Sequence, residues 1–211
     1  GIKNILDLSV KHKIKRVFYS SSSEVYGEPF EIPQNEKTTP LNSSLPYAVV
    51  KNLGEVYFKT YKKEFNLDYT IFRFFNTYGL NQSTDFVVPR FVNKAIEGES
   101  IEIYGDGAQT RTFCWVEDNV DTCINCLYCD LGINDIINVG SGKEISIKNL
   151  AQLVIKLASS SSDIKFIDAL EEGDMTRRCP DTSKMRLILK RDLLTLEDGL
   201  KKMIEHYAQR S

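Results

Sequence analysis

Short apolar segments of strand length alternate with longer amphipathic segments of helical length along this chain of 211 residues. The alternation predicts an α/β protein with a largely parallel sheet, because parallel strands must be joined by long crossover connections. We expect strands at 16–20, 69–74, 101–104, 136–139 and 164–167, and helices at 2–11, 46–65, 89–97, 117–131, 147–157 and 195–207.

Polar residues follow the first two predicted strands. In parallel α/β sheets, ligands bind beyond the carboxyl ends of the strands. Ser22 comes just after the strand at 16–20, and Asn76 just after the strand at 69–74. We therefore expect both residues at the ligand-binding edge of the sheet.

The helix at 46–65 carries boundary signals of its own. Ser43 or Ser44 is expected to cap its N-terminus, and Pro46 suits its first turn. Asn66 is a plausible C-terminal stop, because asparagine tolerates the left-handed conformation.

The composition argues against polyanionic partners and membranes. The net charge is −2, with 27 basic and 29 acidic residues, so there is no excess of basic residues for binding nucleic acid or an anionic membrane surface. No apolar run approaches the ~20 residues that span a bilayer. The chain opens with Gly1-Ile2-Lys3-Asn4, which is neither a start methionine nor a signal peptide. We expect a cytoplasmic protein.

Three of the five cysteines form a C-x-x-C-x-x-C run at 123–129. Such a run can bind zinc or an iron–sulfur cluster, but here apolar residues recur around it at helical spacing. Buried cysteines commonly act as small apolar side chains, and the chain has only two histidines. We expect no disulfide and no metal. The apolar residues that carry this interpretation are Val120, Ile124, Leu127 and Leu131.

Tyr47 and Lys51 are four residues apart on a predicted helix and therefore share one of its faces. An ammonium close to a phenol stabilises the phenolate, which can then take a proton from a hydroxyl. Ser22, 25 residues earlier on a loop at the ligand-binding edge, could hydrogen-bond the same hydroxyl. A Tyr-x-x-x-Lys pair occurs by chance in many helices, so this interpretation depends on its context.

That context is a series of motifs in one order: VFYSSSSEVYGEP, PYAVVK, RFFNTYG, IEIYGDGAQTRTF with VED, and INVGSG. The series resembles the extended short-chain dehydrogenases/reductases, which include NAD-dependent nucleotide-sugar epimerases, dehydratases and decarboxylases. The likeness, which is strongest to UDP-glucose 4-epimerases, covers essentially the whole chain. It implies a partial Rossmann fold, a doubly wound parallel sheet, with a smaller mixed α/β region that binds a nucleoside-diphosphate sugar.

The resemblance also implies site residues by position. Ser22, Tyr47 and Lys51 match the catalytic triad, with Tyr47 as the base; Ser23 and Glu24 complete the catalytic set. Lys51 would in addition hold the nicotinamide ribose of NAD. The implied NAD contacts are Ser20, Tyr47, Lys51 and Phe74. The implied partner is a nucleoside-diphosphate sugar, expected to be a UDP-sugar. Its implied contacts are Asn76, Val88, Tyr104, Arg111 and Arg178.

The resemblance divides the chain into two regions. Residues 1–76 are expected to be the C-terminal part of the Rossmann domain, with 113–140 returning to it. Residues 77–112 and 141–211 are expected to form the nucleotide-sugar region.

The chain departs from the family pattern at two points. Family members begin with a strand and a G-x-x-G-x-x-G turn that binds the pyrophosphate, whereas this sequence starts at a later helix. We therefore expect it to lack that N-terminal part, which would leave an open sheet edge at 16–20. The arginine that many epimerases place before a Gly-Asp pair is Glu172 here, and Arg177 or Arg178 is the candidate to replace it.

The favoured function is an NAD-dependent epimerase acting through a transient 4-keto sugar. The first alternative is a UDP-glucuronate decarboxylase, because Ser23-Glu24 and Arg178 fit that activity. Ser23 also replaces the aspartate of the Asp-Glu pair of dehydratases. The second alternative is a catalytically silent fragment that binds a nucleotide sugar or dimerises. The helices at 2–11 and 47–65 resemble a four-helix dimer interface, and with apolar residues such as Leu8, Val56 and Tyr61 they predict a homodimer.

Overall fold

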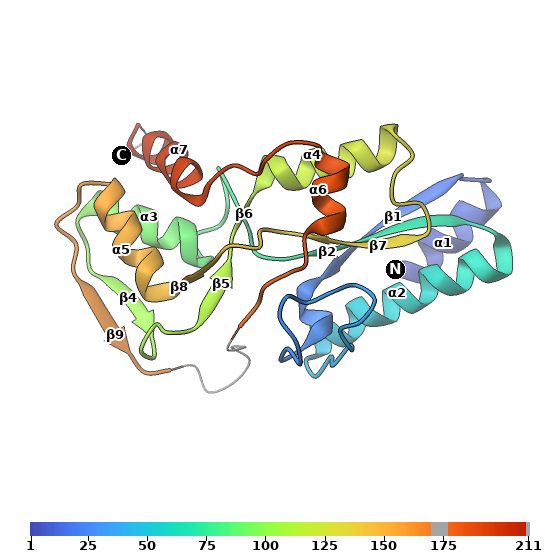
Figure 1. The fold of residues 1–211 in the computed structure, drawn as a ribbon, viewed down its shortest axis with the longest axis horizontal. Helices are drawn as coiled ribbons and strands as arrows, with labels where there is room; N and C mark the ends of the chain where they lie inside the picture. The colour runs from blue at the N-terminus through green and yellow to red at the C-terminus, as the bar shows by residue number, and fades with distance from the viewer. Residues whose placement is uncertain (170–176, 210–211) are drawn as a thin grey trace.

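A parallel three-stranded sheet lies at the centre of one half of the molecule in the computed structural model, which describes residues 1–169 and 177–209 (Figure 1). Its strand order is β1-β2-β7, with bounds Arg16–Ser22, Asp68–Phe74 and Asp135–Val139. Ser22 pairs with Phe74 in the last register position of β1 and β2, so both strands end at the same edge. The predicted proximity of the Ser22 and Asn76 segments is thus confirmed.

Helices cover both faces of this sheet (Figure 1). The helices α1 (Ile2–Lys11) and α2 (Pro46–Phe65) lie on one face, and α4 (Val116–Tyr128) and α6 (Ser183–Leu189) lie on the other. Alternate residues of each strand point to opposite faces. The core under α1 and α2 includes Leu6, Phe58, Tyr69 and Ile71, and the core under α4 and α6 includes Phe72, Ile137, Val139 and Met185.

The other half of the molecule has its own apolar core around Trp115, Phe91, Leu150 and Leu200. Short strand pairs surround that core: β3 with β6, β4 with β9, and β5 with β8. These strands are Thr77–Tyr78, Cys114–Trp115, Ile101–Tyr104, Ile164–Ile167, Thr110–Thr112 and Glu144–Ser146. The helices here are α3 (Val87–Glu97), α5 (Ile147–Leu157) and α7 (Leu196–Ala208). The prediction of a mixed α/β fold with parallel sheets is confirmed, while the residue boundaries of the two regions stay a prediction.

Most predicted elements match the observed ones within a few residues, and the exceptions are short. Four two- or three-residue strands, the helix α6 and a 3₁₀ helix at Ser23–Tyr26 were not predicted. The open edge expected at 16–20 is observed, since β1 pairs only with β2 within the described residues.

The ends of α2 test three boundary predictions. Pro46 is in the first turn, and Asn66 is a left-handed C-cap whose N–H bonds to the Lys62 carbonyl, as expected. The predicted serine cap is wrong, because the N-cap is Leu45 and no side chain caps this end. Ser43 instead donates its hydroxyl to the Val25 carbonyl, which ties the preceding loop to the 3₁₀ helix.

The cysteines of helix α4 are not all buried, although the apolar interpretation expected them to be. Cys126 is buried, Cys123 is partly buried and Cys129 is exposed, and all five cysteines are free thiols. Val120, Ile124 and Leu127, which recur around these cysteines, are each close to half exposed. No group of ligating side chains suited to a metal, and no helix able to span a membrane, occurs among the described residues.

Candidate active site

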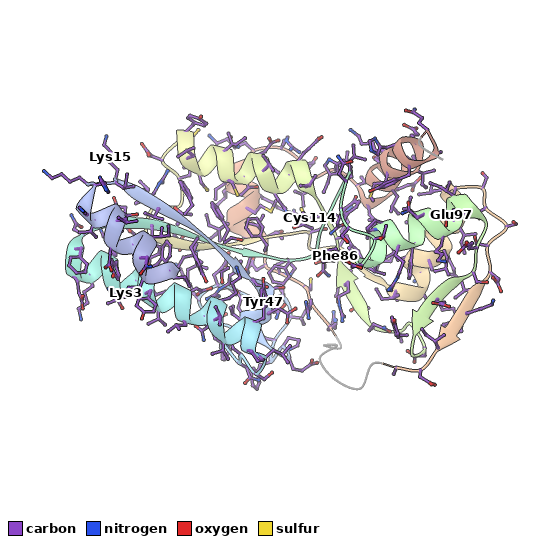
Figure 2. The ribbon with its side chains drawn as sticks, turned by 180° about the vertical axis from the view of Figure 1, so that it is seen from behind. Lys3, Lys15, Tyr47, Phe86, Glu97 and Cys114 are labelled. Atoms are coloured by element: carbon purple, nitrogen blue, oxygen red, sulfur yellow. The ribbon has the colours of Figure 1, made fainter. Side chains whose placement is uncertain are left out.

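A cavity of about 610 Å³ opens at the carboxyl ends of β1 and β2, between the two halves of the molecule. The segment 20–24 forms one wall, and Arg111, Phe113 and the start of α3 form the other. Figure 2 shows Tyr47 and Phe86 near the middle of the molecule, at the N-terminal ends of α2 and α3. Ten predicted site residues line this cavity: Ser20, Ser22, Ser23, Glu24, Tyr47, Phe74, Asn76, Val88, Arg111 and Arg178.

The serine run changes conformation within the cavity wall. Ser21 and Ser22 end strand β1, and Ser23 begins the 3₁₀ helix. Ser22 is extended and caps that helix by accepting a hydrogen bond from the Glu24 N–H at 3.2 Å. The Ser22 hydroxyl proton is not used in this bond, so the hydroxyl can still donate to a ligand.

Tyr47 and Lys51 lie together on the first turns of α2. Tyr47 is 57% exposed and borders the cavity, and the Lys51 ammonium lies 5.5 Å from the centre of its ring. Lys51 does not line the cavity. Its Nζ donates to the Ser20 carbonyl at 2.8 Å, which places the ammonium beside the end of β1.

Glu24 and Arg178 form an ion pair at the cavity wall, with Arg178 Nη1 2.6 Å from Glu24 Oε1. Both side chains are largely buried, at 19% and 11% exposure. Glu24 Oε2 and Arg178 Nε are buried without a hydrogen-bond partner in the part of the chain that the structure describes. Buried polar atoms rarely lack partners, so this pair has bonding capacity suited to a ligand.

The opposite wall carries a buried cation. Arg111 is 7% exposed and its Nη1 donates to the Thr110 carbonyl at 2.7 Å. Asn76 and the buried Val88 line the same cavity. Tyr104 lies outside the lining, on β4, where the Arg90 guanidinium is 5.7 Å from its ring. The structure does not bring Tyr104 to the cavity.

Several lining residues were not predicted. Gln82 donates from Nε2 to the Thr77 carbonyl at 3.0 Å, and its buried Oε1 has no partner among the described residues. Phe86 and Phe113 add apolar surface. Gln82 lies in a polar loop without a recognisable pattern, so no sequence signal marked it. Glu172 lies outside the described residues.

The cavity therefore combines a phenol with a nearby ammonium, a serine hydroxyl, a carboxylate–guanidinium pair and a second guanidinium. Proton transfer from a hydroxyl and the binding of a phosphate or carboxylate are the chemistry that such groups provide.

Comparisons with known proteins show which family this chain resembles in sequence and in structure. The sequence model described as the NAD dependent epimerase/dehydratase family matches residues 1–140. UDP-glucuronic acid decarboxylase 1 of Danio rerio is 33% identical over 99% of this chain and 51% of its own length. UDP-N-acetyl-alpha-D-glucosaminuronate decarboxylase of Bacillus cytotoxicus is 34% identical over 99% of this chain and 68% of its own length. The chain thus spans about half to two thirds of these relatives.

The same likeness holds for structure. The crystal structure of UDP-glucose 4-epimerase from Thermotoga maritima, with UDP-glucose, superimposes with a TM-score of 0.92 at 26% identity. The match covers 99% of this chain and 68% of that protein.

Proposed function

The chain belongs to the NAD-dependent epimerase/dehydratase family, and from that premise we propose that its cavity binds a UDP-sugar and acts through a transient 4-keto sugar. The observation that carries the proposal is the convergence of Ser22, Tyr47, Glu24 and Arg178 on one cavity, with Lys51 beside it. Arg111 on the opposite wall supplies a cation for the diphosphate.

The residues around Lys51 fit the nicotinamide-ribose end of NAD. Lys51 uses one N–H donor on Ser20, and an ammonium has three, so donors remain for ribose hydroxyls. Phe74 provides a half-buried aromatic surface at the end of β2. When bound, NAD would accept the hydrogen at C4 of the sugar with its electron pair and later return it.

The remaining steps belong to side chains of this chain. Tyr47, as the phenolate, takes the proton of the C4 hydroxyl, and Ser22 donates a hydrogen bond to the same oxygen. The Lys51 ammonium lies 5.5 Å from the centre of the Tyr47 ring, on the side of the cavity where the proton is taken up. The product of this step is a ketone at C4.

The Glu24–Arg178 pair favours decarboxylation of a UDP-uronic acid as the overall reaction. The Arg178 guanidinium has donors left to bind the C6 carboxylate, which is β to the new C4 ketone. The C5–C6 bond then breaks, carbon dioxide leaves, and the electron pair forms the C4 enolate. The proton that C5 gains comes from water, and the Glu24 carboxylate is our candidate to orient that water molecule. The hydroxide that remains takes up the released carbon dioxide as bicarbonate. Return of hydrogen to C4 and of the proton from Tyr47 to its oxygen completes a UDP-pentose.

Epimerisation at C4, which the sequence favoured, is the second candidate. It uses the same Tyr47, Ser22 and Lys51 but makes no use of a carboxylate-binding pair. The structural likeness to UDP-glucose 4-epimerase supports it. Glu24 and Arg178 would then only hold the segment around 178 against the cavity.

Product analysis distinguishes the two reactions. The protein expressed from its complete reading frame is incubated with NAD and either UDP-glucuronate or UDP-glucose. Mass spectrometry identifies a decarboxylated product, and proton NMR identifies a C4 epimer, which has the same mass as the substrate. Decarboxylation releases carbon dioxide and a UDP-pentose from the first substrate, whereas epimerisation yields the C4 epimer of either sugar. Arg178→Met should abolish decarboxylation, while Arg177→Met should not, because Arg177 is half exposed and pairs with Glu144 away from the cavity. Turnover of neither substrate would refute the proposal.

We also propose that the protein is a homodimer through α1 and α2. These helices expose Ile5, Leu8, Leu53 and Val56 to about half of their surface. Apolar side chains at this density on two adjacent helices are typical of a surface that a second copy buries. Tyr61, predicted to contribute to this surface, is instead buried and donates its hydroxyl to Asp7.

A further inference from the structure

A fully buried ion pair lies beneath the candidate active site, on the α2 side of the sheet. Arg73 of β2 donates from Nε and Nη2 to the two carboxylate oxygens of Glu55 on α2, at 2.8 and 2.7 Å. Glu55 is 0% exposed and Arg73 is 2% exposed. Burial opposes the charge of Arg73, but the hydrogen bonds that the guanidinium donates to Glu55 and Tyr26 hold its pKa above the ordinary value.

Hydrogen bonds from this pair reach three further elements of the site. Ser21 of β1 donates its hydroxyl to Glu55 Oε1 at 2.7 Å. Arg73 Nη1 donates to the Tyr26 hydroxyl at 2.8 Å, and that hydroxyl donates to Asn138 of β7 at 2.8 Å. Two of these three residues lie close in sequence to a cavity residue: Ser21 precedes Ser22, and Tyr26 is two residues after Glu24.

The network also extends to the segment that carries Arg178. Asn138 Nδ2 donates to the Gln34 carbonyl at 2.8 Å. The Gln34 N–H donates to the Cys179 carbonyl, and the Asp181 N–H donates back to the Gln34 carbonyl, both at 2.8 Å. Cys179 directly follows Arg178, so a continuous set of buried bonds joins the arginine of the cavity to Arg73.

Stability alone is a weak reason for a pair of this kind. Removing two charges from water costs about as much as their attraction returns, and apolar replacements of a buried pair are often neutral or stabilising. What the pair does provide is a fixed orientation of the two elements that carry it. A guanidinium and a carboxylate joined by two parallel hydrogen bonds allow only one relative placement of those elements. The elements so joined are α2, which carries Tyr47 and Lys51, and the strands that end at the cavity.

We propose that Arg73 and Glu55 are positioning residues that set α2 against β2 and, through Ser21, against β1, and so hold Tyr47 opposite Ser22. The inference rests on the proposed function, because it assigns the distance between these two side chains a role in turnover. Glu55 lies eight residues after Tyr47, about 12 Å along a rigid helix at 1.5 Å per residue. A shift of α2 at Glu55 therefore moves Tyr47 by a similar amount.

Close packing next to the pair makes α2 sensitive to such a shift. Gly54 adjoins Glu55 and faces Tyr19 of β1, where a Cβ would lie 2.1 Å from the tyrosine oxygen. The Tyr19 hydroxyl donates to the Lys51 carbonyl at 3.3 Å. The Tyr19 side chain thus lies directly against the backbone of α2, so a shift of the helix would disturb this contact as well.

The test removes both charges together and measures geometry as well as rate. In the protein from the complete reading frame, Glu55→Gln/Arg73→Met keeps an amide oxygen for Ser21 and leaves no buried charge. We expect crystal structures with UDP to show the Tyr47 Oη to Ser22 Oγ distance longer by about 1 Å, and kcat lower by about 10²-fold, since misplacement of this size has that effect. KM and the UDP dissociation constant should stay within about twofold, because Arg111 is not displaced.

Controls distinguish a role in positioning Tyr47 from a general loss of stability. Arg16→Met removes another largely buried arginine, which donates to the Cys126 and Leu127 carbonyls near the C-terminus of α4 at the far end of β1. This change should lower the melting temperature without lowering kcat. If the double variant does not fold, Ser21→Ala, which removes one hydroxyl from Glu55, should shift the same distance and kcat in the same direction. An unchanged distance with kcat within twofold overturns the proposal, as does an equal loss of UDP affinity and kcat. If the wild-type protein turns over neither sugar, the proposed function fails, and the distance alone still decides the positioning role.

Discussion

Breaking the Arg73–Glu55 pair from one side should be far more damaging than removing both charges. Arg73→Met retains most of the apolar stem but leaves the Glu55 carboxylate at 0% exposure. Its remaining partners among the described residues are the Ser21 hydroxyl and, at 3.9 Å, the Lys59 ammonium. An uncompensated buried charge of this kind costs about 3–5 kcal/mol. For a chain of this size each kcal/mol lowers the melting temperature by about 2–4 °C, so we expect a fall of about 6–20 °C.

Adding Glu55→Gln removes that charge and should restore more than half of the loss. Differential scanning calorimetry on the wild type, both single variants and the double variant closes a thermodynamic cycle and gives the coupling between the two side chains. The reasoning would be refuted if the double variant melted at or below the temperature of Arg73→Met, since the damage would then come from packing rather than from an unpaired charge.

Four further outcomes can be measured on the same protein. Tyr47→Phe should lower kcat by about 10²–10⁴-fold with no change in melting temperature, because only the proposed proton acceptor is lost; near-normal turnover by steady-state kinetics would exclude that role. Arg111→Ala should weaken UDP binding by about 2–3 kcal/mol in calorimetry, because charge-assisted bonds to the diphosphate are lost, while NAD affinity stays unchanged. Leu8→Asp should convert the proposed dimer into a monomer by light scattering, and a wild-type monomer at micromolar concentration would contradict the dimer. Burial raises the pKa of the Cys123 and Cys126 thiols to about 11 and about 12, so neither forms the reactive thiolate at pH 8. A disulfide reagent should therefore label the exposed Cys129 first. Equal labelling rates for all three cysteines would contradict the burial argument.

The arrangement of the sheet and its ligand-binding edge could be predicted because local signals repeat there. Strands of β-branched and aromatic residues alternate with helices, and polar residues end the strand at 16–22 and follow the strand at 68–74. Those signals are sufficient to place Ser22 and Asn76 at one edge. The short strands at 77–78, 110–112, 114–115 and 144–146 have too few residues for a periodic pattern, and their pairing is decided by packing around Trp115.

The capping of α2 shows why local propensity misled the prediction. Ser43 and Ser44 have the preferred side chains for an N-cap, yet the chain uses the Ser43 hydroxyl to hold the loop against Val25. Pro46 already supplies a helical φ and lacks one of the N–H groups that a cap would satisfy, so the helix begins without one. The tertiary contact of the loop therefore outweighs the local preference.

The residues that hold the site together were harder to predict than the residues that line it. Glu55 lies on an amphipathic helix rich in charged residues, where a glutamate usually faces solvent, and Arg73 interrupts an apolar strand without a sequence partner nearby. Only the parallel pairing of β1 and β2, with α2 packed across them, brings Ser21, Glu55 and Arg73 to one point. A single arginine in an otherwise apolar buried strand is a usable signal, because a buried charge must be paired. In this topology its partner is the acidic residue one helical turn after the lysine of the Tyr-x-x-x-Lys motif.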